Sequence, residues 1–395
     1  MTAKAPNILI VMADQMVPAF LPIYGHPVVR APAMQALARD GVVFDSAYCA
    51  SPLCAPSRAS FMSGLLPSRT GVYDNAAEFA ADLPTFAHAR RLRGYRTLLS
   101  GKMHFCGPDQ LHGFEQRLTT DIYPADFNWT PDWDRPADRP SWYHNMGSVR
   151  DAGLCVRSNQ LDFDDEAAFM AERAIFDLAR SRDRRPFLLV ASFSHPYDPF
   201  APPQPYWDLY RERGHRHAVS RKCARRSLST APPRLRYGRR AGEGSADARG
   251  AARLLRLDRL YRRTHRPTDG GPAVGCFGRG HNRRPDQRSR RDARRKMSFF
   301  EGACRVPLVV AAPGRFEPHR VAASVSLVDL MPTLVELSGG NAQSLGIGRR
   351  WTQPCSSAQR RRRTRRSVWR VSGRGCYGAD RDDPPRPLQV HSFAR

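Results

Sequence analysis

The sequence predicts a three-layer α/β domain with helices on both faces of a mainly parallel central sheet. Two observations lead to this fold class. Short apolar runs alternate along the chain with segments of helical periodicity. The apolar runs are also nearly continuous, which is typical of strands buried on both faces of a parallel sheet. The predicted sheet is incomplete, because two strongly basic segments interrupt the pattern.

Four strands are expected from these apolar runs. The first covers residues 8–12 and is followed by Asp14, and the second lies in 95–105, YRTLLSGKMHF. The third covers 187–193 and the fourth lies in 305–314, RVPLVVAAPG. Because open α/β sheets place their sites at the carboxyl ends of strands, the polar residues after these runs are candidates for function.

Three helices are expected between and after the strands. Apolar residues recur at helical spacing in the segment 31–44, where Gly41 is a plausible C-cap. The segment 164–181 is amphipathic, and the segment 326–340 ends in two glycines. Together with the strands, these helices support an α/β arrangement.

The net charge of +26 is concentrated in two segments. Residues 211–296 carry a net charge of +20 and residues 341–395 carry +10, whereas the remainder carries −4. Neither segment shows a sustained apolar period. Since an 85-residue loop inside a compact domain is unusual, these segments are expected to be disordered or poorly folded.

The cysteines and the apolar content bear on location. The nine cysteines are scattered without CxxC pairs, which favours reduced thiols and a cytoplasmic protein. The amino-terminal stretch does not resemble a signal peptide. No apolar run approaches the roughly 20 residues of a membrane span, so no membrane partner is expected.

The stretch 51–75, SPLCAPSRASFMSGLLPSRTGVYDN, carries the most specific pattern in the chain. Cys54 is followed by the Pro-Ser-Arg that ends at Arg58, and then by small residues and Gly64. This order resembles the signature of sulfatases. The alternative is a cysteine that merely precedes a helix starting at Pro56.

Further segments narrow the resemblance. PNILIVMADQ, GHPVVRAP, GVYDNAAEF and KMSFFEGACRVPLVVAAPGRF are similar to choline-sulfatases, within the alkaline phosphatase superfamily. The resemblance implies an alkaline-phosphatase-like sandwich. It divides the chain into the first part of the catalytic domain (1–210), an aberrant arginine-rich segment (211–295), the remainder of the catalytic domain (296–340) and a basic tail in place of the C-terminal subdomain (341–395).

The resemblance also implies a mechanism of sulfate-ester hydrolysis. A maturating enzyme that generates formylglycine would convert Cys54, and the hydrated aldehyde would attack sulfur. A divalent metal, Ca²⁺ in relatives with Mg²⁺ or Mn²⁺ as alternatives, would be held by Asp14 and by the residue derived from Cys54. The expected substrate is a small sulfate ester such as choline O-sulfate, and such relatives are oligomeric. Without the resemblance, Asp14 could equally be a turn or helix cap.

The resemblance also assigns roles to individual residues that match positions in the sulfatase motifs. Arg58 would hold the formylglycine and sulfate region, while Lys102 and Lys296 match sulfate-contacting lysines. His104 matches the histidine that deprotonates the intermediate, and His195 the histidine near the leaving oxygen. Outside this context, each would be taken as an ordinary solvated or core side chain.

Three residues are candidates for the substrate side: Asn75, Trp129 and His144. An indole face suits a quaternary ammonium group through cation–π attraction. Plain packing is the alternative for Trp129.

One element of the sulfatase pattern is missing. Relatives carry an Asp-His metal pair in an Asp-His-Gly sequence shortly before the second lysine, but the residues before Lys296 read RSRRDARR. Codons that encode 288–294 can also encode Asp-His-Gly when read one base later. The same offset in 213–218 and 371–392 gives family-like sequence. We therefore hypothesise two frame disruptions, which would leave the chain impaired or inactive.

Two other functions remain as alternatives. A phosphatase or phosphonate monoester hydrolase would share the fold and the cysteine motif. A non-catalytic nucleic-acid-binding protein would use arginine runs such as 359–367, QRRRRTRRS, to contact phosphates. Because no recognition helix, zinc motif or interleaved aromatic residue accompanies these runs, specific nucleic-acid binding is not expected.

Overall fold

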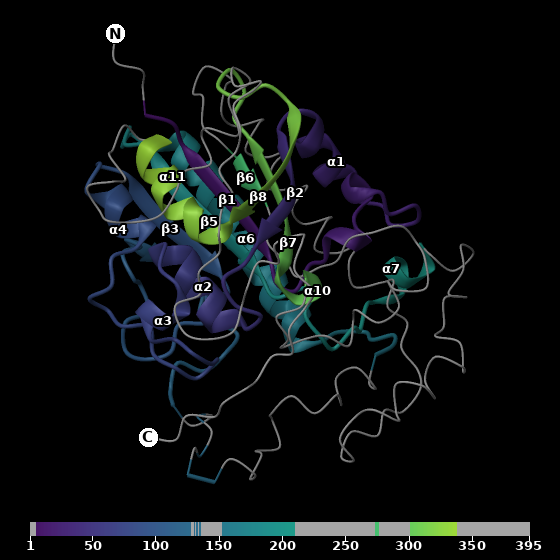
Figure 1. The fold of residues 1–395 in the computed structure, drawn as a ribbon, viewed down its shortest axis with the longest axis horizontal. Helices are drawn as coiled ribbons and strands as arrows, with labels where there is room; N and C mark the ends of the chain where they lie inside the picture. The colour runs from purple at the N-terminus through teal and green to yellow at the C-terminus, as the bar shows by residue number, and fades with distance from the viewer. Residues whose placement is uncertain are drawn as a thin grey trace, which may run out of the picture.

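The computed structural model of the 395-residue chain shows one eight-stranded sheet with helices packed against it (Figure 1). The structure describes residues 5–127, 130, 132, 134–135, 152–209, 273–275 and 301–337. The strands are β1 (Ile8–Ala13), β2 (Val42–Tyr48), β3 (Arg96–Gly101), β4 (Gln116–Arg117), β5 (Phe187–Phe193), β6 (Ala273–Gly275), β7 (Arg305–Ala311) and β8 (His319–Ser326). The α-helices are α1 (Pro32–Arg39), α2 (Cys54–Ser63), α3 (Pro67–Thr70), α4 (Phe86–Arg91), α6 (Asn159–Arg180), α7 (Gln204–Asp208), α10 (Glu301–Cys304) and α11 (Leu330–Leu337). Short 3₁₀ helices are η1 (Pro18–Phe20), η2 (Pro22–Tyr24) and η5 (Leu327–Asp329).

The strand order is β4-β3-β5-β1-β6-β7-β2-β8. Strand β1 lies at the centre and pairs in parallel with β5 and β6, and β3 continues the parallel arrangement on the other side of β5. Strand β7 runs antiparallel to both of its neighbours, β6 and β2. The sheet is therefore mainly parallel, as predicted, with one reversed strand among those described.

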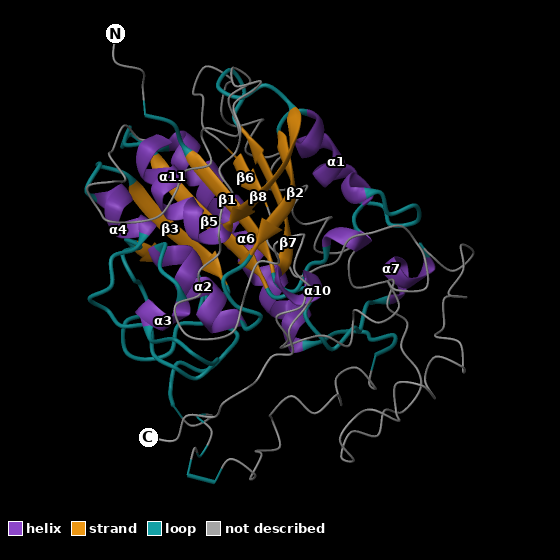
Figure 2. Ribbon diagram, in the orientation of Figure 1, coloured by secondary structure: helices purple, strands orange, loops and turns teal. Residues whose placement is uncertain are grey.

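Alternate residues of β1 enter two different cores. Ile8, Ile10 and Met12 pack into a core that includes residues of α2, α4 and α11. Leu9 and Val11 point to the opposite face and pack against apolar residues of α6 and α1. Since side chains alternate across a strand, helices on both faces of the sheet explain why β1 is apolar at every position. Figure 2 shows these layers, with the strands between the two sets of helices.

The predicted elements differ from the structure in a few places. Helix α6 begins at Asn159, five residues before the predicted segment, because Ser158 accepts a hydrogen bond from the Leu161 amide and caps it. Helix α1 has Asp40 at its C-cap, so Gly41, the predicted cap, lies one residue beyond the observed cap. Strands β2 and β8 were not expected, because Asp45 and Ser46 interrupt the apolar run of β2 and several positions of β8 are exposed.

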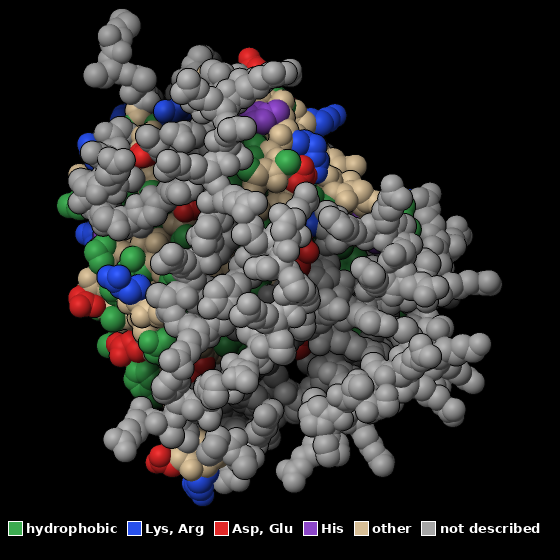
Figure 3. All heavy atoms as spheres, viewed as in Figure 1, with side chains coloured by type: hydrophobic (Ala, Val, Ile, Leu, Met, Phe, Trp, Pro, Cys, Tyr) green, Lys and Arg blue, Asp and Glu red, His purple; other side chains and the backbone are tan. Residues whose placement is uncertain are grey.

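The two basic segments lie almost entirely outside the described residues. Three residues of the predicted aberrant segment 211–295 form β6, which inserts between β1 and β7. The expectation that segment 211–295 is disordered or poorly folded stays a prediction for its other residues, which lie outside the described part of the chain. The tail 341–395 lies outside the described residues. On the face seen in Figure 3, acidic and basic side chains of the described part are interspersed, without a patch of one sign.

Candidate functional site

Three of the predicted site residues follow directly from the ends of neighbouring parallel strands. Asp14 follows β1, Lys102 follows β3, and His195 stands two residues after β5. The register aligns Ala13 with Phe193 and Gly101 with Ser192, so the three strand ends lie at one edge of the sheet. The structure therefore brings these side chains to the edge where α/β enzymes place their sites, as predicted.

A glycine at the end of β3 positions Lys102. Gly101 has φ +95°, and a Cβ at this position would collide with the carbonyl oxygen of Ser192 on β5. The left-handed turn lets the Lys102 amide donate to the same carbonyl at 2.9 Å. The lysine side chain is fully buried as a result.

Cys54 is the first residue of α2, the helix that the motif forms. The helix runs to Ser63 and ends with Gly64 in the left-handed region. The Cys54 thiol donates to Asp14 Oδ1 at 3.6 Å. The amide of Ala55 donates to Asn75 Oδ1 at 3.0 Å, so Asn75 caps the start of this helix. The amino-terminal end of a helix favours an anion, and Cys54 stands at that end of α2.

Two cations converge on Asp14. The Lys102 ammonium forms an ion pair with Asp14 Oδ2, and Arg58 Nη2 lies 3.4 Å from the same oxygen. Arg58 Nη1 also donates to Ser192 Oγ at 2.9 Å. Burial alone would lower the pKa of Lys102, but the Asp14 carboxylate beside it raises that pKa above its ordinary value. The Lys102 ammonium is thus charged at neutral pH inside a buried site.

Two tyrosines complete the surroundings of Lys102. Its ammonium lies 4.5 Å from the ring centroid of Tyr123 and 4.7 Å from that of Tyr197. The faces of both rings attract the cation and keep water from it. The sequence analysis missed both tyrosines, since neither stands at a strand end or in the cysteine motif.

His104 is held in a strained backbone conformation with a neutral ring. Its φ is +62°, and its amide donates to Asp121 Oδ2 at 2.7 Å. The ring stacks on Tyr123 with centroids 4.4 Å apart, and Nε2 lies 2.9 Å from the carbonyl oxygen of Asn75. Burial, and then the charge of Lys102, lower the pKa of His104 to about 3. A neutral imidazole at this position can accept a proton.

Asp121 holds the loop that contains Met103 and His104. Its Oδ2 accepts hydrogen bonds from the amides of Met103 and His104 and from Arg117 Nη2, the last at 2.7 Å. Burial raises the pKa of Asp121, but Arg117 and these bonds outweigh it and hold the pKa below its ordinary value. The sequence analysis missed Asp121, because its role depends on a loop conformation that only the structure reveals.

His195 is paired with a carboxylate of the long helix α6. His195 Nδ1 lies 2.6 Å from Asp164 Oδ2, and Asp164 is 1% exposed. The sequence analysis treated 164–181 only as an amphipathic helix. A usable signal was present, because Asp164 lies three and seven residues before Ala167 and Ala171 on the apolar face of that helix.

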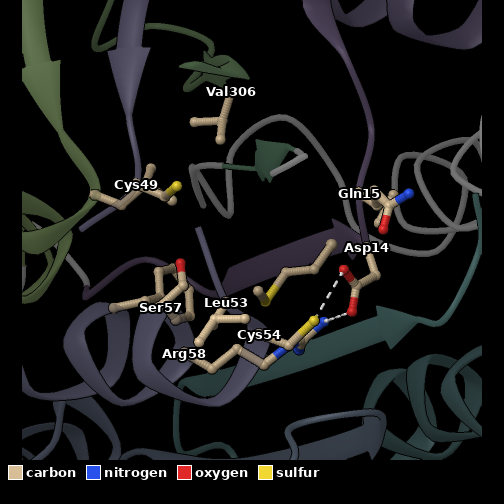
Figure 4. Close-up of a pocket in the computed structure, with 12 residues that line it drawn as sticks. Asp14, Gln15, Cys49, Leu53, Cys54, Ser57, Arg58 and Val306 are labelled. Atoms are coloured by element: carbon tan, nitrogen blue, oxygen red, sulfur yellow. Dashed lines mark hydrogen bonds and ion pairs between the residues drawn. The ribbon is translucent and has the colours of Figure 1, made fainter. Parts of the chain in front are cut away.

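A pocket opens beside the Asp14–Cys54–Arg58 cluster. Figure 4 shows Asp14, Cys54 and Arg58 directed toward one another across it, with Ser57 on α2 and Gln15 on opposite sides. Its lining is completed by apolar residues and one further cysteine: Met12, Ala13, Cys49, Leu53, Phe61, Val306 and Leu327. Gln15 has φ +60°, the left-handed region, and the sequence analysis did not single it out.

Three further predicted site residues lie outside the described residues: Lys296, Trp129 and His144. Within the described part of the chain, the structure brings Asp14, Cys54, Arg58, Lys102 and His104 into one cluster.

Comparison with known proteins identifies the family. The sequence model of the sulfatase family matches residues 6–271. The chain belongs to the sulfatase family. Sulfatases are sulfuric ester hydrolases, and the predicted resemblance to them is confirmed.

The sulfatase is similar to several curated relatives. It is 42% identical over 376 residues to a choline-sulfatase of Rhizobium meliloti (strain 1021), covering 90% of this chain and 71% of the relative. It is 29% identical to a steryl-sulfatase of Mus musculus, covering 85% of this chain and 62% of the relative.

Solved structures confirm the fold class. A phosphonate monoester hydrolase of Agrobacterium radiobacter superposes with a TM-score of 0.58 at 22% identity, covering 85% of this chain and 74% of that one. The enzyme SpPMH of Silicibacter pomeroyi gives 0.61 at 18% identity, covering 90% and 78%. The sulfatase therefore has the alkaline-phosphatase-like α/β fold. Among its described helices, none is long and apolar enough to cross a membrane.

The described residues do not by themselves fit the divalent metal that sulfatases generally use. Within this part of the chain, no group of three His, Cys, Asp or Glu side chains could hold a metal ion. Asp14 is engaged by Lys102 and Arg58, and Cys54 is its neighbour. A hard cation such as Ca²⁺ takes six to eight oxygen ligands. Asp14 and position 54 are thus a partial donor set.

Proposed function

We propose that this sulfatase hydrolyses a small sulfate ester, choline O-sulfate, through a formylglycine made from Cys54. The observation that carries the proposal is the placement of Cys54 at the start of α2, against Asp14 and next to Arg58 and Lys102. A sulfate group needs buried cations and hydrogen-bond donors around its oxygens, and this cluster supplies both.

Each described residue has a step in the proposed reaction. The sulfate oxygens bind to the Arg58 guanidinium and the Lys102 ammonium, with Lys296 as a second lysine. Formylglycine at position 54, once formed, supplies the hydroxyl that attacks sulfur. His195 gives a proton to the leaving alcohol oxygen. His104, whose lowered pKa leaves its ring neutral, would accept a proton from the group at position 54.

The substrate assignment is supported by the choline-sulfatase of Rhizobium meliloti, at 42% identity. The trimethylammonium group would contact the Trp129 ring by cation–π attraction, with Asn75 and His144 near the substrate. Asn75 is engaged in the described structure through its side-chain oxygen, which accepts from the Ala55 amide. The side-chain NH₂ of Asn75 is therefore the group that would contact the substrate.

The alternative within the fold is a phosphonate monoester or phosphate ester hydrolase. The phosphonate monoester hydrolases of Agrobacterium radiobacter and Silicibacter pomeroyi share the fold at 22% and 18% identity. The assay that separates these functions measures release of sulfate from choline O-sulfate beside hydrolysis of a phenyl phosphonate and a phenyl phosphate. Faster turnover of either phosphorus ester would reject the choline O-sulfate proposal. The third possibility, a non-catalytic nucleic-acid-binding protein, would show salt-sensitive binding of DNA without any ester hydrolysis.

Full activity also depends on ligands that the described residues do not supply. We propose that the metal is Ca²⁺, held by Asp14 and position 54, and that this chain binds it weakly because the Asp-His pair is missing before Lys296. The hypothesis of two frame disruptions, in 211–295 and 341–395, is tested by the nucleotide sequence. If the alternative frame does not encode Asp-His-Gly near Ser289, the hypothesis is rejected. Sulfate release at a rate of several turnovers per second would contradict the expected impairment.

The proposed maturation can be tested apart from activity. A formylglycine-generating enzyme would replace the Cys54 thiol with an aldehyde, and mass spectrometry of the peptide that contains Cys54 detects the change. We further propose a cytoplasmic location, which is supported by the free thiols of the described cysteines: Cys49, Cys54, Cys106, Cys155 and Cys304. The resemblance to choline-sulfatases implies an oligomer, and the mass of the purified protein in solution tests this for the chain.

A further inference from the structure

The loop that carries His195 is tied to α6 by a single carboxylate. Asp164 Oδ1 accepts hydrogen bonds from the amide of Ser194 at 2.6 Å and from its hydroxyl at 2.9 Å. Oδ2 accepts from the amide of His195 at 3.0 Å and contacts ring atom Nδ1 at 2.6 Å. Four contacts from two consecutive residues fix both the backbone and the imidazole ring.

The same face of α6 makes two further contacts, one to this loop and one to β3. Gln160, one turn before Asp164, donates from Nε2 to the carbonyl oxygen of Asp198 at 2.9 Å. One turn after Asp164, the carbonyl oxygen of Ala167 accepts from Ser100 Oγ of β3 at 2.8 Å. Since residues three or four apart lie on one side of a helix, this side of α6 spans the ends of β3 and β5. The imidazole is therefore anchored to a regular element, which positions a reactive group more firmly than a loop does.

The charge of Asp164 decides which ring nitrogen carries a proton. Burial raises the pKa of Asp164, but the hydrogen bonds from His195 and Ser194 outweigh it and hold the pKa below its ordinary value. An ionised carboxylate can only accept hydrogen bonds. Nδ1 of His195 must therefore carry a proton, and Nε2 is the nitrogen left to face a reacting group.

We propose that Asp164 is a positioning residue, which fixes His195 in the tautomer whose Nε2 exchanges a proton with the leaving alcohol. This inference rests on the proposed function. As the bond between sulfur and the ester oxygen breaks, its electron pair stays on that oxygen, and the Nε2 proton moves to it. The ring becomes neutral with Nδ1–H still bound to Asp164, ready to be protonated again from solvent at Nε2.

The first test measures the tautomer without requiring activity. The full chain is labelled with ¹⁵N-histidine, and the ring of His195 is assigned by loss of its signals in His195→Gln. At a pH where the ring is neutral, we expect a protonated Nδ1 and a bare Nε2. In Asp164→Asn, we expect this preference to be lost, because the amide can donate to Nδ1 as well as accept from it.

The matched control is the neighbouring carboxylate. Asp165 is exposed and pairs with Arg157 Nη1 at 2.9 Å on the outer side of α6. Asp165→Asn should leave the His195 signals unchanged. Protonation at Nε2 in the unmodified protein, or an unchanged spectrum in Asp164→Asn, would overturn the proposal. The unmodified protein decides the question even if Asp164→Asn does not fold.

The second test uses the leaving group. Loss of a positioned general acid costs about 10²-fold or more in rate. We expect Asp164→Asn to lower kcat for an alkyl sulfate such as choline O-sulfate about 100-fold, with KM changed less than twofold. A nitrophenyl sulfate, whose leaving oxygen needs no proton, should lose less than about fivefold, and Asp164→Glu should restore part of the alkyl rate. An equal loss on both esters would show a merely structural role. If the unmodified chain hydrolyses neither ester, the proposed function fails, while the tautomer still tests Asp164.

Discussion

The ion pair between Lys102 and Asp14 should contribute strongly to stability, and replacing Lys102 with Met measures that contribution. The Lys102 side chain is fully buried, and that of Asp14 is 7% exposed. Methionine fills much of the volume of the lysine stem, so the substitution removes the charge with little change in packing. Among the described residues, Arg58 is then the cation that stays paired with Asp14.

The expected loss in free energy of unfolding depends on the charges that remain after Lys102 is replaced. Removing one partner of a buried ion pair costs about 3–5 kcal/mol, because the other charge is left buried without compensation. Arg58 Nη2 stays 3.4 Å from Asp14 Oδ2, an attraction of about 5 kcal/mol at an effective dielectric constant of about 20. Since this attraction keeps the carboxylate partly compensated, we expect the free energy of unfolding to fall by the lower figure, about 3 kcal/mol.

Urea unfolding followed by tryptophan fluorescence measures this change. The control is Arg180→Met, which removes the exposed pair of Arg180 with Asp177 on α6 and should change stability by less than about 0.5 kcal/mol. The double variant Asp14→Asn with Lys102→Met should cost at least about 1 kcal/mol less than the sum of the single changes, since the two charges are coupled. A loss below about 1 kcal/mol for Lys102→Met, or strict additivity in the double variant, would refute the reasoning.

Four further results are expected. The native pKa of His104 is lowered from 6.5 to about 3, so the unfolded chain binds one more proton between these values. The free energy of unfolding should therefore fall by up to about 1.4 kcal/mol per pH unit as the pH drops below 6.5, and an unchanged slope in His104→Gln would contradict this origin. Asp121→Asn weakens three hydrogen bonds to a buried carboxylate and should cost about 2–3 kcal/mol in urea unfolding; a loss below 1 kcal/mol would speak against its support of the loop. Cys54→Ala should abolish any sulfate release and the aldehyde-containing peptide while the unfolding midpoint stays nearly constant, and residual hydrolysis would exclude Cys54 as the source of the nucleophile. Inorganic sulfate should raise the free energy of unfolding by about 2.7 kcal/mol at 100 times its Kd, and this gain should be lost in Lys102→Met.

Much of the central sheet could be predicted because its strands are defined by local composition. The run from Phe187 to Phe193 is apolar except for Ser192, and the predicted and observed limits of β5 coincide. The direction of β7 could not be predicted, because an apolar run looks the same in either orientation and its neighbours are set by the chain's path. Strand β8 was missed since its exposed positions, such as Ala323 and Ser324, break the apolar pattern that marks a buried strand.

Site residues could be predicted where they belong to a local sequence pattern. Asp14 stands at a strand end and Cys54 within a fixed motif, so the sequence alone indicated both. Asp164 and Asp121 act through bonds to residues 31 and 17 positions away, and their sequence surroundings are an ordinary helix and an ordinary loop. Such supporting carboxylates become visible only when the fold brings their partners to them.

The charges at the described edge of the sheet argue for an anionic ligand. Lys102 and Arg58 bring two positive charges to the single carboxylate of Asp14, and His104 stays neutral because of its lowered pKa. The charges of Asp121 and Arg117 compensate each other a little farther away. Among the described residues, this cluster of two cations and one carboxylate has an excess of one positive charge, and such a buried excess is costly unless an anion balances it. A sulfate monoester carries one negative charge, and the cluster at Cys54 is where that charge would be balanced.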